Sequence, residues 1–229
     1  MRSSALPKYI LLLLSFISLL LAPYQTWAAD HQDLDTIRTL AEKGSSEAQF
    51  KLGVAYDAGE GVPQDHKQAV LWYTKAAEQG DADAQSILGV AYANGVGVPQ
   101  DLKQAVLWFT KAAEQGHANA QSNLGVAYAN GQGVPQDYKK AVLWYTKAAE
   151  QGVANAQYNL GKAYANGQGV PKDNALAYAW ESLAAISGDK EAVEVRNSLA
   201  AQLNPKALAE AQALAGSLQE KIDSRQKKE

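Results

Sequence analysis

The sequence predicts an all-α protein built from consecutive pairs of antiparallel helices, and three observations support this fold class. A 36-residue pattern that begins at Ala48 starts again at Ala84, Ala120 and Ala156 without an insertion. Inside each copy the apolar residues recur at the spacing of a helix and not of a strand. Each copy also contains a Gly-x-Gly-Val-Pro corner, which separates two helices because glycine accepts positive φ and proline cannot continue a helix.

The first helix of each pair is indicated by an apolar stripe and by a terminal glycine. In the first copy the positions i, i+4, i+7 and i+8 are occupied by Ala48, Leu52, Ala55 and Tyr56. Gly59 follows them, and we expect it to end the helix in the left-handed conformation.

The second helix of each pair is expected to begin after Asp65, whose carboxylate can cap the free amides of the first turn, and to end at Gly80. Its core-facing stripe consists of Ala69, Trp72, Tyr73, Ala76 and Ala77. Because small alanines alternate with bulky aromatics, neighbouring helices can interlock, and each buried tryptophan removes about 150–250 Å² from water.

Sequence on both sides of the four copies completes one predicted solenoid domain, residues 30–223. A half-repeat, 34–47, comes first because it matches the second half of a copy. The full repeats are 48–83, 84–119, 120–155 and 156–191. Each repeat is expected to contact only its neighbours, as in other solenoids.

The C-terminal part reads as capping helices within residues 192–222, and the polar residues 224–229 are expected to fray. Asn204 and Pro205 are the predicted N-cap and first position of the last helix, because an asparagine side chain can accept a bond from the first turn and proline has no amide to satisfy.

The first 28 residues differ in composition from the rest of the chain. Arg2 and Lys8 precede an apolar run over residues 10–22, which is shorter than the roughly 20 apolar residues of a membrane-spanning helix. Small residues then surround Ala28. We therefore expect a secretory signal peptide, residues 1–28, with cleavage after Ala29 or retention as an uncleaved anchor as the alternatives. The mature chain is expected in the periplasm, or outside the cell as the alternative, without stable membrane insertion.

Composition excludes several classes of function. The 229 residues include 21 Lys and Arg against 24 Asp and Glu, a formal net charge of −3, so no basic surface for nucleic acid is expected. The chain has no Cys, which removes thiolate catalysis, cysteine metal sites and disulfides. The three histidines, His31, His66 and His117, are far apart in the sequence. We predict no metal site and no cofactor.

The repeating unit is A-x3-L-G-x2-Y-x2-G-x-G-V-x2-D-x3-A-x2-W-x3-A-A-x2-G, and it resembles the Sel1-like repeat, a relative of the tetratricopeptide repeat. The resemblance covers residues 48–191 and implies a right-handed α-solenoid of antiparallel helix pairs, whose first helices line a concave face. The fourth copy departs from the pattern at Lys162, Glu181 and Ile186-Ser187. This copy is therefore interpreted as a transition to the cap, with a different outward surface.

Two short motifs suggest chemistry but have simpler explanations. Gly59-Glu60-Gly61 and its copies follow a helix instead of a strand, and the carboxylate of Asp65 would occupy the helix N-terminus where a phosphate binds. Ser224-x-x-Lys227 matches a penicillin-enzyme motif but has no Lys-Thr-Gly partner in the chain.

Two rows of residues recur once per repeat. A tryptophan row could stack on glycans, but each member lies on an alanine-rich stripe, so core packing is predicted for Trp72, Trp108, Trp144 and Trp180. A carboxylate row could bind metal, but each member follows a proline corner, so helix capping is predicted for Asp65, Asp101, Asp137 and Asp173.

The candidate binding face is the part of each first helix that the core stripe does not use. Across the four copies it contains Phe50, Ser86, Ser122 and Tyr158; Lys51, Ile87, Asn123 and Asn159; and Val54, Val90, Val126 and Lys162. This mixture of apolar atoms, aromatic rings and amides suits a peptide or helix of a partner protein. The alternative is a solvated surface that varies by drift. A further set, Asn94, Asn130 and Asn166, is equally consistent with helix C-caps or with contacts.

Two functions from different classes follow. The first is a non-catalytic exported scaffold that binds another protein through its concave face. The alternative is a protein that binds or hydrolyses cell-wall material, because the resemblance extends to cysteine-rich relatives linked to penicillin binding. That precedent depends on cysteines that this chain lacks, and no cluster of Ser, His, Lys or carboxylates indicates a nucleophile. The sequence does not indicate the oligomeric state.

Overall fold

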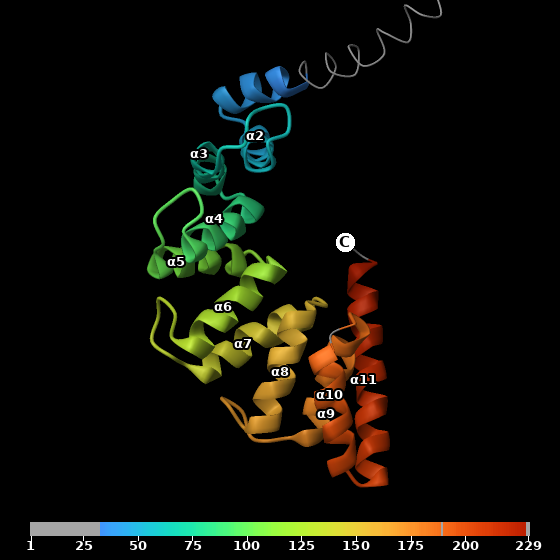
Figure 1. The fold of residues 1–229 in the computed structure, drawn as a ribbon. Coiled ribbons are helices and arrows are strands. Elements are labelled where there is room, and N and C mark those ends of the chain that lie inside the picture. Colours follow the sequence, from blue (N-terminus) through green and yellow to red (C-terminus); the bar gives the residue numbers. More distant parts are fainter. Residues whose placement is uncertain (1–32, 189, 228–229) are drawn as a thin grey trace, which may run out of the picture. The chain divides into compact units, whose positions relative to one another are not determined.

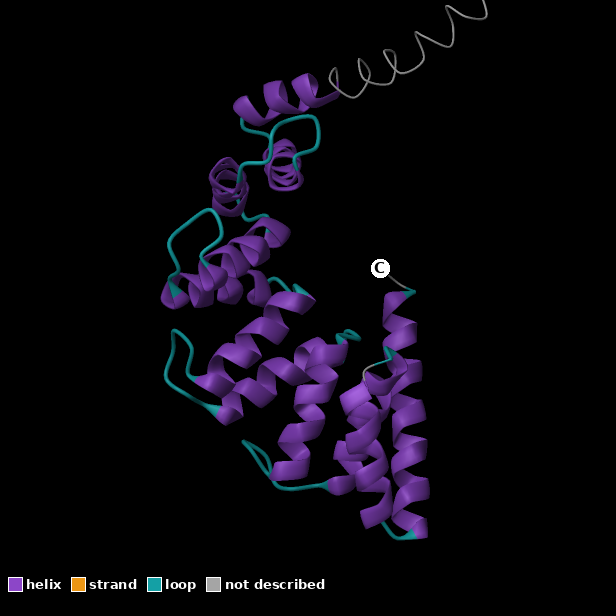
Figure 2. Ribbon diagram, viewed as in Figure 1, coloured by secondary structure: helices purple, strands orange, loops and turns teal. Residues whose placement is uncertain are grey.

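The protein is represented by a computed structural model that describes residues 33–188 and 190–227, and every regular element in that part of the chain is a helix (Figure 1, Figure 2). The predicted signal peptide lies outside these residues. The chain divides into two compact units, Met1–Gln79 and Gly80–Glu229.

The first unit contains a helix over residues 33–42, α2 (Ser46–Ala58) and α3 (His66–Glu78). Leu34 in the first of these helices, Leu52 in α2 and Trp72 in α3 share one buried core. The predicted half-repeat therefore supplies the apolar surface that α2 would otherwise leave exposed to water.

The second unit continues the same alternation in its described part. Its helices are α4 (Ala82–Asn94), α5 (Leu102–Glu114), α6 (Ala118–Asn130), α7 (Tyr138–Ala149), α8 (Ala154–Asn166), α9 (Asn174–Ile186), α10 (Lys190–Gln202) and α11 (Pro205–Gln226). From α4 to α9 each helix packs against its neighbour in sequence, and both α10 and α11 pack against α9. The predicted all-α solenoid of antiparallel helix pairs is confirmed.

The helix ends follow the predicted chemistry. Gly59 adopts φ +76° at the end of α2, and its amide donates to the carbonyl of Ala55. Asp101 accepts bonds from the amides of Lys103 (2.9 Å) and Gln104 (3.1 Å) at the start of α5. The predicted caps of α3 and α9 also accept two amide bonds, and Asp137 accepts one at α7. The first helix of the fourth repeat is different, because Val153 at its N-cap offers no side-chain acceptor.

A glycine in each first helix brings the paired second helix into close approach. A Cβ on Gly89 would lie 2.4 Å from the ring of Phe109, and the same relationship joins Gly53 to the ring of Tyr73. In the fourth repeat the partner of this glycine is the buried side chain of Glu181. The glycine of the Leu-Gly pair in the repeat pattern is therefore required for helix packing.

A buried glutamine in each first helix is bonded both within its own repeat and to the repeat before it, a feature that the sequence analysis missed. Gln151 Nε2 donates to Gln121 Oε1 at 2.7 Å, and Gln121 Nε2 donates to the carbonyl of Ala113 at 3.1 Å. Gln115 and Gln85 form the equivalent bond one repeat earlier, at 2.8 Å. These bonds satisfy polar groups that would be costly to bury alone. The recurrence of glutamine every 36 residues was the available signal.

Two predictions need correction, one about the burial of the tryptophans and one about the end of the last helix. Trp72, Trp108 and Trp180 are buried as expected, but Trp144 is only half-buried and packs against the core between α5 and α6. The last helix also extends past its expected end near Ile222, up to Gln226.

Contacts with the third repeat hold the end of α11 in place. Lys221 and Arg225 pair with Glu150 at 3.5 Å and 3.2 Å, and Gln226 Nε2 donates to the carbonyl of Gln151 at 3.3 Å. The predicted fraying of residues 224–229 therefore does not apply to residues 224–226, which are helical.

Candidate protein-binding face

Two hollows on the second unit lie where the sequence predicted a binding face. We number each of them after the repeat that supplies most of its lining. The second hollow, about 230 Å³, is formed by α4, α5 and α6 and is lined mainly by apolar side chains. Val90, Val106, Phe109 and Val126 supply its apolar surface, and Asn123 is among its polar residues. An apolar surface with a few amides can hold an apolar side chain and orient the adjoining backbone.

The third hollow, about 250 Å³, lies one repeat further along, between α6, α7 and α8. With the exception of Gln136, each residue that lines it comes 36 residues after a residue that lines the second hollow. Val126 borders both hollows. The repeat therefore produces two equivalent depressions that share a wall.

The third hollow is more polar than the second. Lys162, Tyr145 and Tyr138 occupy the positions that Val126, Phe109 and Leu102 occupy in the second hollow. Burial raises the pKa of Tyr145 to about 12, so its hydroxyl remains neutral near pH 7. The Nζ of Lys162 lies 4.9 Å from the centre of the Tyr158 ring, which places a cation at this site.

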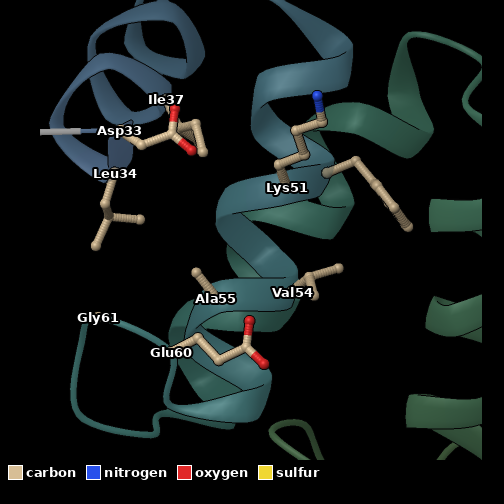
Figure 3. Close-up of a pocket in the computed structure, with 9 residues that line it drawn as sticks. Asp33, Leu34, Ile37, Lys51, Val54, Ala55, Glu60 and Gly61 are labelled. Atoms are coloured by element: carbon tan, nitrogen blue, oxygen red, sulfur yellow. The ribbon is translucent and has the colours of Figure 1, made fainter. Parts of the chain in front are cut away.

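The first unit has a related hollow of about 680 Å³, which we call the N-terminal hollow. Figure 3 shows Leu34 and Ile37 approaching from helix 33–42, Val54 and Ala55 from α2, and Glu60 from the following loop. Except for Phe50 and Gly61, each lining residue corresponds to one in the second hollow, two repeats later. The same local geometry therefore occurs in both units.

Carboxylates distinguish the N-terminal hollow from the other two. Asp33, Lys51 and Glu60 line it. The Nζ of Lys51 donates to Glu47 at 2.6 Å, and this bond raises the pKa of Lys51 and lowers the pKa of Glu47. The positive charge of Lys51 is therefore already paired with the carboxylate of Glu47.

Most of the predicted binding residues line these hollows. Phe50, Lys51 and Val54 line the N-terminal hollow, and the second and third hollows contain Val90, Asn123, Val126, Asn159 and Lys162. Asn94 and Asn130 also line them, whereas the C-caps are the glycines that follow.

The prediction of an exposed face is wrong at Ser86 and Ser122, which are buried. For Ser122 the reason is that α6 packs between α5 and α7, so only a narrow strip of the helix remains exposed. Phe50 is half-buried, with its ring 5.8 Å from that of Tyr73. Ile87 and Tyr158 are half-buried and line none of the three hollows described above.

The second and third hollows present apolar surface, amides and one lysine, and the N-terminal hollow adds Asp33, Lys51 and Glu60. Within the described residues no cluster of three or more His, Asp or Glu side chains could hold a metal ion. None of the helices in that same part of the chain is long and apolar enough to span a membrane.

Comparison with known proteins identifies the repeat. The Sel1 repeat matches four consecutive segments, residues 46–81, 82–117, 118–153 and 154–189. The chain is a member of the Sel1 repeat family. The family's repeats have the period expected from the sequence, and each starts two residues before the boundary assigned above. None of the curated proteins matches this Sel1 repeat protein.

Solved structures are similar to this Sel1 repeat protein over much of its length. A protective antigen of uropathogenic Escherichia coli with an SLR fold is 40% identical, with a TM-score of 0.75, over 85% of this chain and 43% of the antigen. A Sel1 repeat protein from Oxalobacter formigenes is 39% identical, with a TM-score of 0.68, over 74% of this chain and 49% of its own. The chain thus spans less than half the length of each.

Proposed function

We propose that this protein is a non-catalytic, exported scaffold that binds a partner protein along the face formed by α4, α6 and α8. The observation that carries the proposal is the pair of hollows that share Val126. An extended peptide that crosses Val126 inserts one side chain into each hollow, so affinity grows by adding small, similar contacts.

The lining of the hollows defines the partner segment. The second hollow accepts an apolar side chain, because Val90, Val106 and Phe109 surround it. The third accepts a polar or acidic side chain, because Asn159 offers an amide and Lys162 a cation. In a partner peptide these two side chains lie on the same side of the backbone, and the distance between them matches the distance between the two hollows.

The proposed location is the periplasm, with secretion beyond the outer membrane as the alternative. It rests on the basic residues and the apolar run within residues 1–28. The description of the E. coli relative as a protective antigen is compatible with a site outside the cytoplasm. Fractionation of a native host and sequencing of the mature N-terminus test this part, and a cytoplasmic full-length chain contradicts it.

Peptide selection tests the binding face. We expect phage-displayed peptides selected on the mature protein to carry an apolar residue followed by a polar or acidic one. Their affinity should fall about tenfold or more for Val126→Asp and for Lys162→Glu, because an uncompensated charge then occupies a shared wall or a rim. Lys190→Glu, on the exposed start of α10, is the matched control. Equal loss in all three variants contradicts the proposal, as does turnover of nitrocefin by the purified protein.

A further inference from the structure

The exposed surface of α5 and α7 outside the hollows carries a repeated pattern of its own. On α5 and α7 a leucine is flanked four residues away on each side by a lysine, and this spacing places the three side chains in one row on the helix surface. The rows are Lys103, Leu107 and Lys111 on α5, and Lys139, Leu143 and Lys147 on α7. The leucines are 46% and 53% exposed. We call these two rows the outer Lys-Leu-Lys rows.

Charge is unevenly distributed between the two kinds of helix. Helices α5 and α7 contain five lysines and one acid, Glu114, whereas α4 and α6 contain no basic residue. The four lysines of the outer rows form no ion pair with acids in the described part of the chain. Lys111 and Lys147 each lie 4.3 Å from the centre of the adjacent tryptophan ring, which restrains their position.

In the fourth repeat the surface that corresponds to the outer Lys-Leu-Lys rows is covered by another helix of the chain. The positions that correspond to Lys139, Leu143 and Lys147 are Ala175, Ala179 and Leu183 of α9. Ala179 is fully buried, and Leu183 shares a core with Ile222 of α11. In Figure 1 α11 lies alongside α9, and the two helices are in contact. A helix of the same chain therefore packs on the uncharged version of the row.

The apolar stripe of α11 defines the shape that fits. It consists of Ala211, Ala215, Leu218 and Ile222, at positions i, i+4, i+7 and i+11. On α5 and α7 the corresponding face differs at all three positions, because lysines replace Ala175 and Leu183 and a leucine replaces Ala179. A helix that packs there must therefore place carboxylates beside its apolar stripe.

We propose that the outer Lys-Leu-Lys rows bind an acidic amphipathic helix of a partner protein. The apolar stripe of that helix covers Leu107 and Leu143, and its flanking Asp or Glu side chains pair with the lysines at both ends of each row. The arrangement repeats the α9–α11 packing with complementary charge added. This surface is separate from the hollows, so the chain can engage two partners at once.

A designed peptide tests the proposal directly. The acidic probe is the 22-residue sequence of α11 with Glu at positions 212, 214, 219 and 221, which flank the apolar stripe; the basic probe has Lys at the same positions. Fluorescence anisotropy with labelled probes and the full mature protein gives the affinities. We expect the acidic probe to bind at least about tenfold more tightly than the basic probe, with an affinity that falls as salt rises.

Protein variants locate the binding site. The double variant Leu107→Ala, Leu143→Ala and the double variant Lys111→Glu, Lys147→Glu should each weaken binding of the acidic probe about tenfold. Leu40→Ala is the matched control, because Leu40 is 46% exposed and lies outside the rows. Equal binding of both probes, or unchanged binding by both double variants, overturns the proposal. Co-sedimentation with phosphatidylglycerol vesicles in the absence of probe binding also overturns it, in favour of a membrane surface.

Discussion

Gly125 of α6 lies directly against the ring of Tyr145 of α7, and a Cβ added at this glycine would sit 2.5 Å from Cδ1 of the ring. Equivalent pairs occur at Gly53 and Tyr73 and at Gly89 and Phe109. The two helices of a repeat can therefore approach closely because the glycine has no Cβ, and the aromatic ring occupies the space that a Cβ would take.

Gly125→Ala should destabilise the protein by about 1–3 kcal/mol, because Tyr145 cannot move away from the new methyl group without disturbing the core. Gly216→Ala is the control. It lies inside α11 with no atom within 4 Å of the new Cβ, so it should stabilise the protein by about 0.5–1 kcal/mol through helix propensity. Urea unfolding followed by circular dichroism measures both. A stabilising Gly125→Ala contradicts the close-packing explanation.

Trp108→Ala should cost about 3–5 kcal/mol, because the indole is buried in the middle of the array. Since each repeat contacts only its neighbours, the loss is also expected to separate one thermal transition into two. The neighbouring exposed residue supplies the control, with Leu107→Ala changing stability by less than about 1 kcal/mol. Calorimetry that shows equal effects for the two variants would mean that the aromatic stripe is not a core element.

Val153→Asp should stabilise the protein by about 1 kcal/mol, because α8 begins without a side-chain cap. The model for the substitution is Asp81, whose carboxylate accepts a bond from the amide of Ala84 at 2.8 Å. The reciprocal change, Asp81→Ala, should cost a similar amount. Differential scanning fluorimetry of the pair checks both signs, and a lower melting temperature for Val153→Asp would contradict the assignment.

Ile222→Ala should destabilise the protein by about 2–4 kcal/mol, because the side chain is buried against Leu183 where α11 covers α9. Ile186→Ala removes the same atoms from a residue that is 70% exposed, and it should change stability by less than about 0.5 kcal/mol. Chemical denaturation of the two variants measures the difference. Similar midpoints would show that α11 is not an integral cap.

The sequence predicted the elements well because their signals are local. The Asp101 cap, the Gly59 terminus and the Asn204-Pro205 start each depend on residues within one turn of the helix end. The all-α repeat architecture followed from periodicity alone, since a stripe at helical spacing that returns every 36 residues has few other solutions.

The details of the binding face were less predictable because they depend on contacts between helices. Ser122 is on the predicted face but buried, since burial is decided by two neighbouring helices and not by position on one. The relation of Gly161 to Glu181 also needed the structure. In the sequence Gly161 belongs to the repeat pattern and Glu181 departs from it, but only the packing of the helices shows that the two residues touch.

The most direct test of the proposed binding face is a methyl-labelled NMR spectrum of the protein, recorded with and without a selected peptide. Valine methyl signals report on the two hollows, and the signals of Leu107 and Leu143 report on the outer Lys-Leu-Lys rows. We expect shifts at Val90, Val106, Val126 and Val142, which line the second and third hollows, and unchanged signals at Leu107 and Leu143. Shifts confined to Leu107 and Leu143, or no shifts at the four valines, would contradict the proposed binding face.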